Sequence, residues 1–322
     1  MMKTTLFLTV VISLIFLAGP SAGNAADKPI RIGYLQSDIH QLACWVALEN
    51  GLYRKHGVEV EVAGIFKAGP EEMSAFAAGA LDVGYVGEAP ATTAVANKAA
   101  EVTVLAQVNT EGSAIVKGKD APIRDVRDLA RKRVAIPGHS TVQDFLLKKA
   151  LLKHNVDQKA VHIIVLKPPE MIGALKTGQI DAFIAWEPYP AKARTMGVGQ
   201  VLLTSHDIWK DHPCCVLVVS NRFLSERPRD AEAAVRAHVE ATDFIREFPD
   251  EAVKIGVKYT GMDAPTIRLA MENVNYTYLL SIDGEREYVD FLSRMKYITL
   301  PDPGAFVETF INQKILGDII HK

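Results

Sequence analysis

Residues 70–88 read PEEMSAFAAGALDVGYVGE, and residues 169–187 read PEMIGALKTGQIDAFIAWE. Gly79 in the first stretch corresponds to Gly178 in the second, and matching Pro, Glu, Ala and Asp residues keep the same offset of 99 positions. In both stretches a helical pattern ends at the glycine and a short apolar run follows. A repeated helix–strand unit of this kind predicts two α/β lobes of the same plan.

Strands and helices alternate outward from this repeat over most of residues 30–203. The expected strands are residues 30–35, 58–63, 82–86, 103–108, 134–136, 162–166, 181–185 and 201–203. Helical patterns lie between them at residues 40–55, 70–78, 89–98, 141–154, 169–176 and 188–195. This alternation predicts parallel sheets with helices on both faces.

The C-terminal third has a different pattern. From about Asn221 onward, the stretches RPRDAEAAVRAHVEATDFIREF and APTIRLAMENVNYTYLL have helical spacing, whereas the preceding CCVLVVS predicts a strand that returns the chain to the first lobe. We therefore expect lobe 1 to comprise residues 27–110 and 217–322, lobe 2 to comprise residues 111–216, and the two crossings to form a hinge. Ligands of open α/β sheets bind beyond the carboxyl ends of the strands, so the cleft between the lobes is the expected site.

Composition and the N-terminus restrict the possible partners. The chain has 322 residues, with 36 Lys and Arg against 38 Asp and Glu, and no polybasic face is expected. Nucleic acid and anionic membrane surfaces are therefore disfavoured as partners. Lys3, an apolar run over residues 6–18 and small residues around Ala25 predict a cleavable signal peptide over residues 1–25. The alternative, a membrane anchor, requires a longer run of roughly 20 apolar residues.

The order of several motifs resembles that of a known family. The segments RIGYLQ, ALENGLYRKHGVEVEV, ALDVGYVGEAPA, RVAIPGHST, GQIDAFIAWEP and VLVVSNRFL follow the signal peptide. The chain thereby resembles the periplasmic solute-binding proteins of ABC importers of the nitrate, taurine and alkanesulfonate type. The resemblance implies a type II periplasmic binding protein fold, a periplasmic monomer without catalytic activity or cofactor, and two partners. These are a small-molecule solute and the ABC transporter permease in the membrane.

Four loops at the ends of strands contain the candidate ligand contacts, some of which the family resemblance implies. They contain Gln36, Ser37, Asp38, His40, Gly87, Glu88, Pro90, His139, Ser140, Thr141, Trp186 and Glu187. Each has a structural alternative. Ser140 or Thr141 can serve as a plain helix N-cap, Trp186 can belong to the core, and the two glutamates can cap their own helices.

The charges of these loops restrict the class of solute that we expect. Asp38, Glu88 and Glu187 are acidic, and the loops contain no Lys or Arg. This pattern disfavours a doubly charged anion. We expect a small polar organic solute or a monoanion, such as a sulfonate, nitrate or a heteroaromatic vitamin precursor.

Two other functions remain open from sequence. A metal or metal-chelate receptor is one, with His40, His212 and Cys214 as candidate ligands, although no C-x-x-C or H-x-x-x-H pair supports it. A pyrimidine-precursor synthase with a related fold is the other, but only Cys214 and Cys215 match its cysteine-rich, iron-associated motif. The third cysteine, Cys44, leaves a disulfide with Cys214 or Cys215 open.

Overall fold

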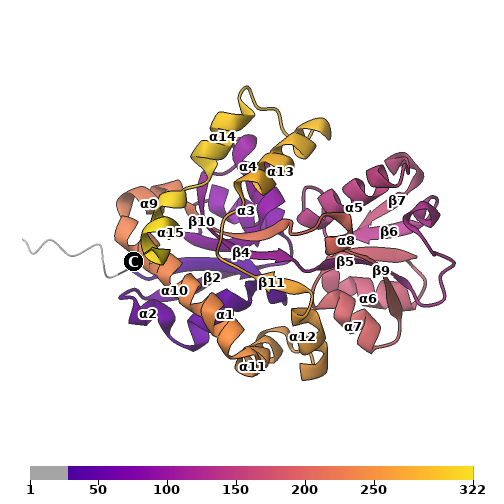
Figure 1. Cartoon of the computed structure of the whole chain (residues 1–322), viewed down its shortest axis with the longest axis horizontal. Helices are drawn as coiled ribbons and strands as arrows, with labels where there is room; N and C mark the ends of the chain where they lie inside the picture. Colours follow the sequence, from indigo (N-terminus) through magenta and orange to yellow (C-terminus); the bar gives the residue numbers. More distant parts are fainter. Residues whose placement is uncertain (1–27, 322) are drawn as a thin grey trace, which may run out of the picture.

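The computed structural model describes residues 28–321, which form two α/β lobes lying side by side along the long axis (Figure 1). The expected signal peptide, residues 1–25, lies outside the described residues. Each lobe is built around one β-sheet. We define lobe 1 as the part of the chain that forms the six-stranded sheet and its helices, and lobe 2 as the part that forms the five-stranded sheet and its helices.

The sheet of lobe 1 has the strand order β11-β4-β10-β3-β1-β2. Its strands are β1 (Ile30–Leu35), β2 (Val60–Phe66), β3 (Val83–Gly87), β4 (Val102–Glu111), β10 (Pro213–Ser220) and β11 (Val274–Tyr276). The sheet of lobe 2 has the order β7-β6-β8-β5-β9. Its strands are β5 (Ser113–Gly118), β6 (Arg133–Ile136), β7 (His162–Val165), β8 (Ala182–Trp186) and β9 (Gly199–Thr204).

The two sheets share one plan, which confirms the duplication predicted from sequence. β1, β2 and β3 of lobe 1 occupy the places of β6, β7 and β8 in lobe 2. The neighbouring strand is β10 in lobe 1 and β5 in lobe 2. Each is the first strand after the chain crosses from the other lobe. These strands run antiparallel to their neighbours, because each enters its sheet from the hinge end. The predicted parallel pairing holds for β1 with β2 and β3, and for β6 with β7 and β8, but the antiparallel strands make both sheets mixed.

A duplicated ion pair fixes the same corner of each lobe. The guanidinium group of Arg31 donates to both carboxylate oxygens of Asp82, over 3.0 and 2.7 Å. The guanidinium group of Arg133 does the same with Asp181, over 3.1 and 2.9 Å. Both carboxylates also accept the backbone N–H of their arginine. These ion pairs tie β1 to the segment before β3 in lobe 1, and β6 to the segment before β8 in lobe 2, at the end of each sheet remote from the cleft.

Most helices lie close to their predicted ranges. Lobe 1 contains the 3₁₀ helix η2 (Ile39–Gln41) and the α-helices α1 (Leu42–Glu49), α2 (Leu52–Lys55), α3 (Gly69–Ala77), α4 (Glu88–Ala96), α9 (Asn221–Glu226), α10 (Pro228–Glu247), α11 (Pro249–Thr260), α12 (Ala264–Met271), α13 (Ile282–Arg294), α14 (Pro303–Phe310) and α15 (Gln313–Ile320). Lobe 2 contains η3 (Val126–Leu129), η4 (Gln158–Ala160), α5 (Val142–Lys153), α6 (Pro168–Lys176), α7 (Tyr189–Thr195) and α8 (Ser205–Ile208). The single helix expected over residues 40–55 is divided, because Gly51 adopts φ 63° between α1 and α2.

Two strands differ from expectation. β5 was not predicted, because its apolar run is only three residues long and charged residues follow it. β11 lies inside a stretch predicted to be helical, and it forms the edge of the sheet beside β4. The helical pattern there ends at Met271, and the backbone groups of residues 274–276 are satisfied by the sheet instead.

The chain crosses between the lobes twice. It leaves β4 at Glu111, passes Gly112 and enters β5, and it returns through α8 to β10. The expected second boundary, after residue 216, falls inside β10. Pro213, Cys215 and Val216 already pair with β4, and the last two also pair with β3, so this segment belongs to lobe 1.

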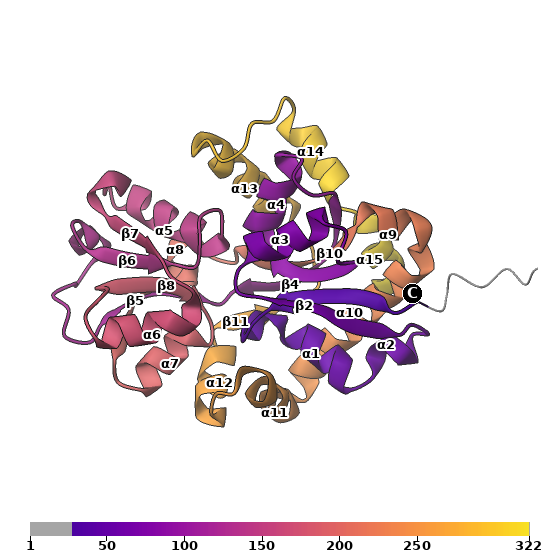
Figure 2. The same cartoon turned by 180° about the vertical axis from the view of Figure 1, so that it is seen from behind.

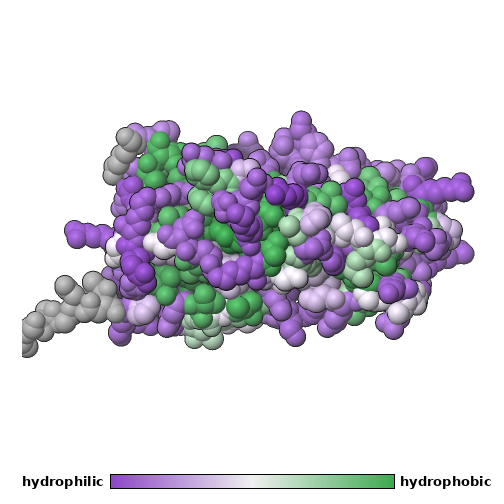
Figure 3. All heavy atoms as spheres, turned by 90° about the horizontal axis from the view of Figure 1, so that it is seen from below, coloured by the Kyte–Doolittle hydropathy of each residue, from purple (hydrophilic) through white to green (hydrophobic). Residues whose placement is uncertain are grey.

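The C-terminal helices of lobe 1 also contact lobe 2. α12 packs on α7, as the view from behind shows (Figure 2). On the other side of the hinge, the ring of Phe145 in α5 lies 4.5 Å from the rings of both Tyr288 and Phe291 in α13. Seen from below, hydrophobic residues are interspersed with hydrophilic ones over both lobes (Figure 3). Among residues 28–321, no helix combines the length and apolar character needed to cross a membrane.

Candidate functional site

The carboxyl ends of the strands in the two lobes meet at a small cavity of about 10 Å³, room for about one water molecule. Both lobes line it. Lobe 1 contributes Leu35, Asp38, His40, Gly69, Gly87, Pro90, Cys214 and Cys215, and lobe 2 contributes Thr141, Val142, Gln143 and Trp186. The two lobes are therefore closed over the cavity in this structure.

His40 is fully buried at the floor of the cavity. Its Nε2 lies 2.9 Å from the carbonyl oxygen of Gly112, in the hinge. Its Nδ1 lies 3.6 Å from Sγ of Cys214, 3.7 Å from Sγ of Cys215 and 3.3 Å from Oδ1 of Asp38. The ring thus connects the hinge to the loop after β1 and to the start of β10.

Asp38 orients this loop. One carboxylate oxygen accepts the backbone N–H of His40 and the other accepts Nε2–H of Gln41, both over 3.0 Å. Burial raises the pKa of Asp38, against the opposing effects of His40 and Gln41. Burial alone would lower the pKa of His40, but the charge of Asp38, the sulfur of Cys215 and the carbonyl of Gly112 raise it to about 9.

The first turn of α5 faces the cavity from lobe 2. Thr141 is its N-cap: the hydroxyl accepts the N–H of Asp144 over 3.2 Å and donates to the carbonyl of Gly138 over 2.8 Å. Ser140 has φ 61°, and its N–H donates to the carboxylate of Asp144. The N-cap alternative therefore holds for Thr141, which also lines the cavity.

His139, next to this turn, does not line the cavity. Its side chain is 61% exposed, and its Nδ1 lies 3.9 Å from the carboxylate of Asp144. Gln36 is exposed and Ser37 is half-buried with φ 50°, and neither lines the cavity. In the loop after β1, only Asp38 and His40 reach it.

Trp186 ends β8 and forms part of the cavity wall. It is 2% exposed, and its indole N–H has no hydrogen-bond partner among the described residues. Gly87 and Pro90 line the same cavity from lobe 1. A Cβ on Gly87 would lie 3.1 Å from Val142 of lobe 2, so the absence of a side chain lets the lobes approach closely.

Neither of the two glutamates at equivalent repeat positions lines the cavity. Glu88 is buried against Gln107, which donates to it over 3.1 Å, and against Glu285 of α13. Thr92 donates to Glu285 over 2.8 Å. Burial raises the pKa of Glu88 to about 7, and burial together with the charge of Glu88 raises the pKa of Glu285 well above its usual value.

Glu187 joins the lobes without lining the cavity. One carboxylate oxygen accepts the N–H of Ala191 in α7 over 2.9 Å, and the other accepts Nδ2–H of Asn273 in lobe 1 over 2.8 Å. Its backbone carbonyl accepts the N–H of Ile39 over 3.1 Å. Burial raises the pKa of Glu187 to about 7. The helix-cap alternative holds here, and the carboxylate adds a bond between the lobes.

Sequence reasoning missed several lining residues. Gln143, whose Nε2–H donates to Ser113 over 2.9 Å, and Val142 lie in the first turn of a helix that was predicted. Leu35 ends the first predicted strand. The sequence therefore predicted that these residues lie at strand and helix ends, but their residue types did not indicate a ligand contact. No feature of the sequence indicated that Gly69 lines the cavity.

The histidine–cysteine cluster differs in one member from the set proposed from sequence. His212 is not part of it, because its Nδ1 lies 2.9 Å from the carbonyl of Pro213 and its ring stacks on Trp209. Cys215 takes the third place beside His40 and Cys214. All three cysteines are free, so the disulfide left open by the sequence is not formed.

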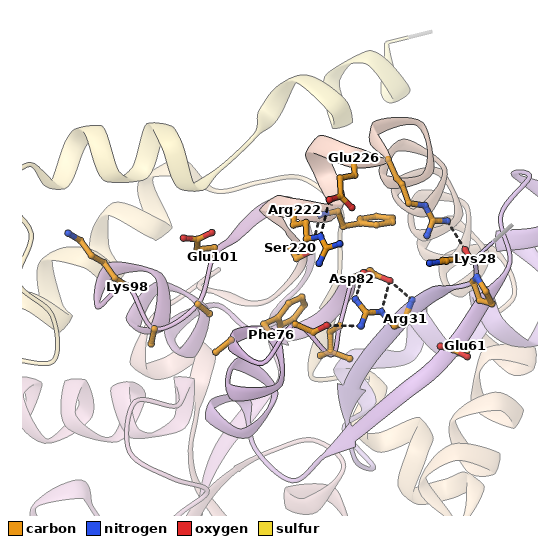
Figure 4. Close-up of a pocket in the computed structure, with 18 residues that line it drawn as sticks. Lys28, Arg31, Glu61, Phe76, Asp82, Lys98, Glu101, Ser220, Arg222 and Glu226 are labelled. Carbon is orange, nitrogen blue, oxygen red and sulfur yellow. Dashed lines mark hydrogen bonds and ion pairs between the residues drawn. The ribbon is translucent and has the colours of Figure 1, made fainter. Parts of the chain in front are cut away.

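A larger hollow of about 770 Å³ lies at the opposite end of lobe 1 (Figure 4). Four of its charged side chains form two ion pairs, Arg31 with Asp82 and Arg222 with Glu226. It lies at the amino ends of β1 and β3 and receives no residue from lobe 2. For these reasons we place the candidate site in the cleft.

Comparison with known proteins agrees with this arrangement. A protein of Bacillus subtilis named as an aliphatic sulfonates-binding protein is 28% identical over 309 residues, covering 90% of each chain. The alkanesulfonate-binding protein SsuA from Xanthomonas axonopodis pv. citri, bound to MOPS, has a TM-score of 0.76 at 19% identity, covering 88% of this chain and 98% of that one. The nitrate-binding protein NrtA from Synechocystis PCC 6803 has a TM-score of 0.80 at 19% identity, covering 91% and 88%.

The structural likenesses identify the fold as that of the periplasmic binding proteins. The family assignment comes from the sequence. The characteristic pattern of the NMT1-like family matches residues 23–257, which is more than half of the chain. The protein therefore belongs to the NMT1-like family.

Proposed function

We propose that the protein is the solute-binding receptor of an ABC importer and captures a small solute between its two lobes. The observation that carries this proposal is the interlobe cavity, which residues at strand and helix ends of both lobes line. Such positions are where open α/β folds bind ligands. Relatives and fold neighbours named as sulfonate-binding or nitrate-binding proteins support the same function.

Capture works through closure of the lobes. A solute that touches both lobes binds the closed state better than the open one, and only this difference in affinity shifts the population. Contacts between the lobes favour the closed state in the same way. They include the hydrogen bond from Asn273 to Glu187 and the ion pair of 2.6 Å between Lys167 and Glu71. The closed pair of surfaces is then what a permease in the membrane recognises.

The lining supports a small polar organic solute or a monoanion as the ligand. No Lys or Arg lines the cavity, and the Asp38 carboxylate does. The His40 ring already lies 3.3 Å from the carboxylate of Asp38, so a doubly charged anion would lose its hydration without gaining an unpaired cation, at a high cost in free energy. The start of α5 and the free indole N–H of Trp186 offer donors sufficient for one negative charge or for polar oxygen atoms.

We further propose that the receptor works as a periplasmic monomer and catalyses no reaction. The names of relatives as binding proteins support the absence of catalysis, and the periplasmic fold neighbours support the location. The signal peptide predicted from the sequence supports export. Sedimentation with and without solute tests the monomer, and fractionation of the native host tests the location.

The central experiment measures stabilisation and closure together. The mature chain is screened by thermal unfolding against sulfonates, nitrate, heteroaromatic amines and sulfate, and each hit is examined by small-angle scattering. A true solute present at 100 times its Kd stabilises by about 2.7 kcal/mol and decreases the radius of gyration. Stabilisation by sulfate alone contradicts the proposed ligand class. Hits that leave the scattering profile unchanged contradict capture by closure.

A further inference from the structure

We propose that His40, Cys214 and Cys215 form a binding site for one thiophilic metal ion, Zn²⁺ or Cu⁺, on the lobe 1 side of the cleft. Nδ1 of His40 and the two sulfur atoms lie within 4.8 Å of one another, and all three residues are buried. All three belong to lobe 1, so the site does not depend on the proposed capture of an organic solute.

The distances match a tetrahedral coordination sphere. Nδ1 of His40 lies 3.6 Å from Sγ of Cys214 and 3.7 Å from Sγ of Cys215. With bonds of roughly 2.0 Å to nitrogen and 2.3 Å to sulfur, tetrahedral ligands are separated by about 3.6 Å. Both nitrogen–sulfur distances therefore suit a shared ion, and the two sulfur atoms lie within 4.8 Å of each other. One imidazole and two thiolates form a ligand set that Zn²⁺ and Cu⁺ prefer.

The hinge fixes the orientation of the histidine. A carbonyl oxygen only accepts hydrogen bonds, so Nε2 of His40 is the protonated nitrogen that donates to Gly112 over 2.9 Å. This leaves Nδ1 facing the sulfurs, and an incoming ion takes the place of any proton there. Metal-binding histidines commonly donate their second N–H to a backbone carbonyl in this way. Gly112, with φ 88°, has no Cβ to approach the ring.

An irregularity in β10 brings the two sulfurs to the same side. Neighbouring residues of a regular strand point to opposite faces of the sheet. In the pairing of β10 with β4, however, the register shifts on both sides of Cys215. Such a bulge redirects a side chain, and here it allows both sulfur atoms to approach His40.

The coordination sphere has one position left, beside a cavity that Asp38 and Trp186 also line. The three ligands line the interlobe cavity together with Asp38 and Trp186. Oδ1 of Asp38 lies 3.3 Å from Nδ1 of His40, and the buried indole N–H of Trp186 has no partner among the described residues. A solute atom bound to the metal would occupy the cavity that Trp186 also lines. If the proposed receptor function is correct, that atom belongs to the captured solute.

The test is metal titration of the mature, reduced chain in competition with a chromophoric Zn²⁺ chelator, and separately with a Cu⁺ chelator. The wild type is expected to bind one equivalent of at least one of these ions. His40→Ala, Cys214→Ser and Cys215→Ser should each weaken binding by about 100-fold or more. Co²⁺ as a probe should give a thiolate-to-metal charge-transfer band that either serine substitution reduces.

Two control variants separate this site from other metal binding. Cys44→Ser removes a buried thiol that is not in the cluster and should leave the titration unchanged. His206→Ala disrupts the second potential metal group, Glu111, His206 and Asp211, and should leave the Co²⁺ charge-transfer band unchanged. Circular dichroism checks that each variant folds.

The proposal is overturned if neither ion binds stoichiometrically, or if the three cluster variants bind as well as the wild type. It is also overturned if His206→Ala alone abolishes binding. Failure of the receptor function looks different: metal binds at the cluster, but no organic solute or monoanion changes the scattering profile. Closure by a solute without any metal binding would instead leave the receptor function intact and remove the metal site.

Discussion

The backbone carbonyl of Gly112 lies 2.9 Å from Nε2 of His40, which connects the first crossing between the lobes to the loop that follows β1. The same carbonyl accepts the N–H of Glu187 over 2.8 Å. One hinge peptide therefore contacts both lobes at the floor of the cleft. Its conformation depends on glycine, because φ is 88° and a Cβ would lie 2.2 Å from the His40 ring.

Gly112→Ala should therefore destabilise the protein strongly. The left-handed backbone alone costs about 1–3 kcal/mol for a residue with a side chain, and the clash with His40 adds to this. Urea unfolding measures the loss. Gly173→Ala is the matched control, because a Cβ there meets nothing within 4 Å and the residue lies in helix α6. Equal stability of the two variants would contradict the hinge argument.

Gly87→Ala should impair closure while preserving the fold. The added Cβ would lie 3.1 Å from Val142 across the cleft, and the backbone at Gly87 has an ordinary negative φ. Overpacking costs about 1–3 kcal/mol. The contacts with Pro90, at 3.2 and 3.3 Å, lie within lobe 1 and act in both states, whereas the contact with Val142 acts only on the closed state. Solute affinity should fall about tenfold, with a larger radius of gyration at saturation. Wild-type affinity in this variant would show that the lobes do not meet here when solute is bound.

The ion pair between Lys167 and Glu71 should contribute modestly to closure. Its nitrogen and oxygen lie 2.6 Å apart, but both side chains are partly exposed, and such pairs are worth up to about 1 kcal/mol. Lys167→Gln should weaken solute binding by at most about fivefold. Because salt screens exposed charges, the difference from wild type should shrink at high ionic strength. Lys176→Gln, exposed on α6, is the control and should bind like the wild type.

The buried pair Glu88 and Glu285 should make stability depend on pH. Both pKa values are raised, that of Glu88 to about 7, whereas the unfolded chain ionises near pH ~4.5. The folded state thus binds more protons between these values. The free energy of unfolding should therefore fall as pH rises through this window, and the stabilising effect of the protonated pair is complete below it.

Glu285→Gln should flatten this pH dependence, because one of the two buried acids no longer titrates. Urea unfolding at about pH 5 and about pH 8 measures the difference. Glu101→Gln, at an exposed position of the same lobe, should retain the wild-type slope. An unchanged slope in Glu285→Gln would mean that the pair ionises in the folded protein as it does in the unfolded chain.

The sequence by itself determined the plan of the fold. Helix and strand periodicity is local, so the repeat at residues 70–88 and 169–187 could be recognised without knowledge of the tertiary structure. The structure keeps its spacing: α3 begins at Gly69 and α6 at Pro168, again 99 residues apart. The loops at the carboxyl ends of the strands were likewise predicted to face the cleft, and residues from each of them line the cavity.

Only the tertiary structure decided where individual side chains point. Glu88 and Glu187 occupy equivalent places in the repeat, yet Glu88 faces Glu285 and Glu187 faces Asn273, because different C-terminal elements pack against the two lobes. The grouping of Cys215 with His40 depends on a register shift between β10 and β4, strands about 100 residues apart. Pairing between distant strands leaves no periodic pattern in the sequence. For this physical reason the sequence predicted where the site lies, but not which side chains come together in it.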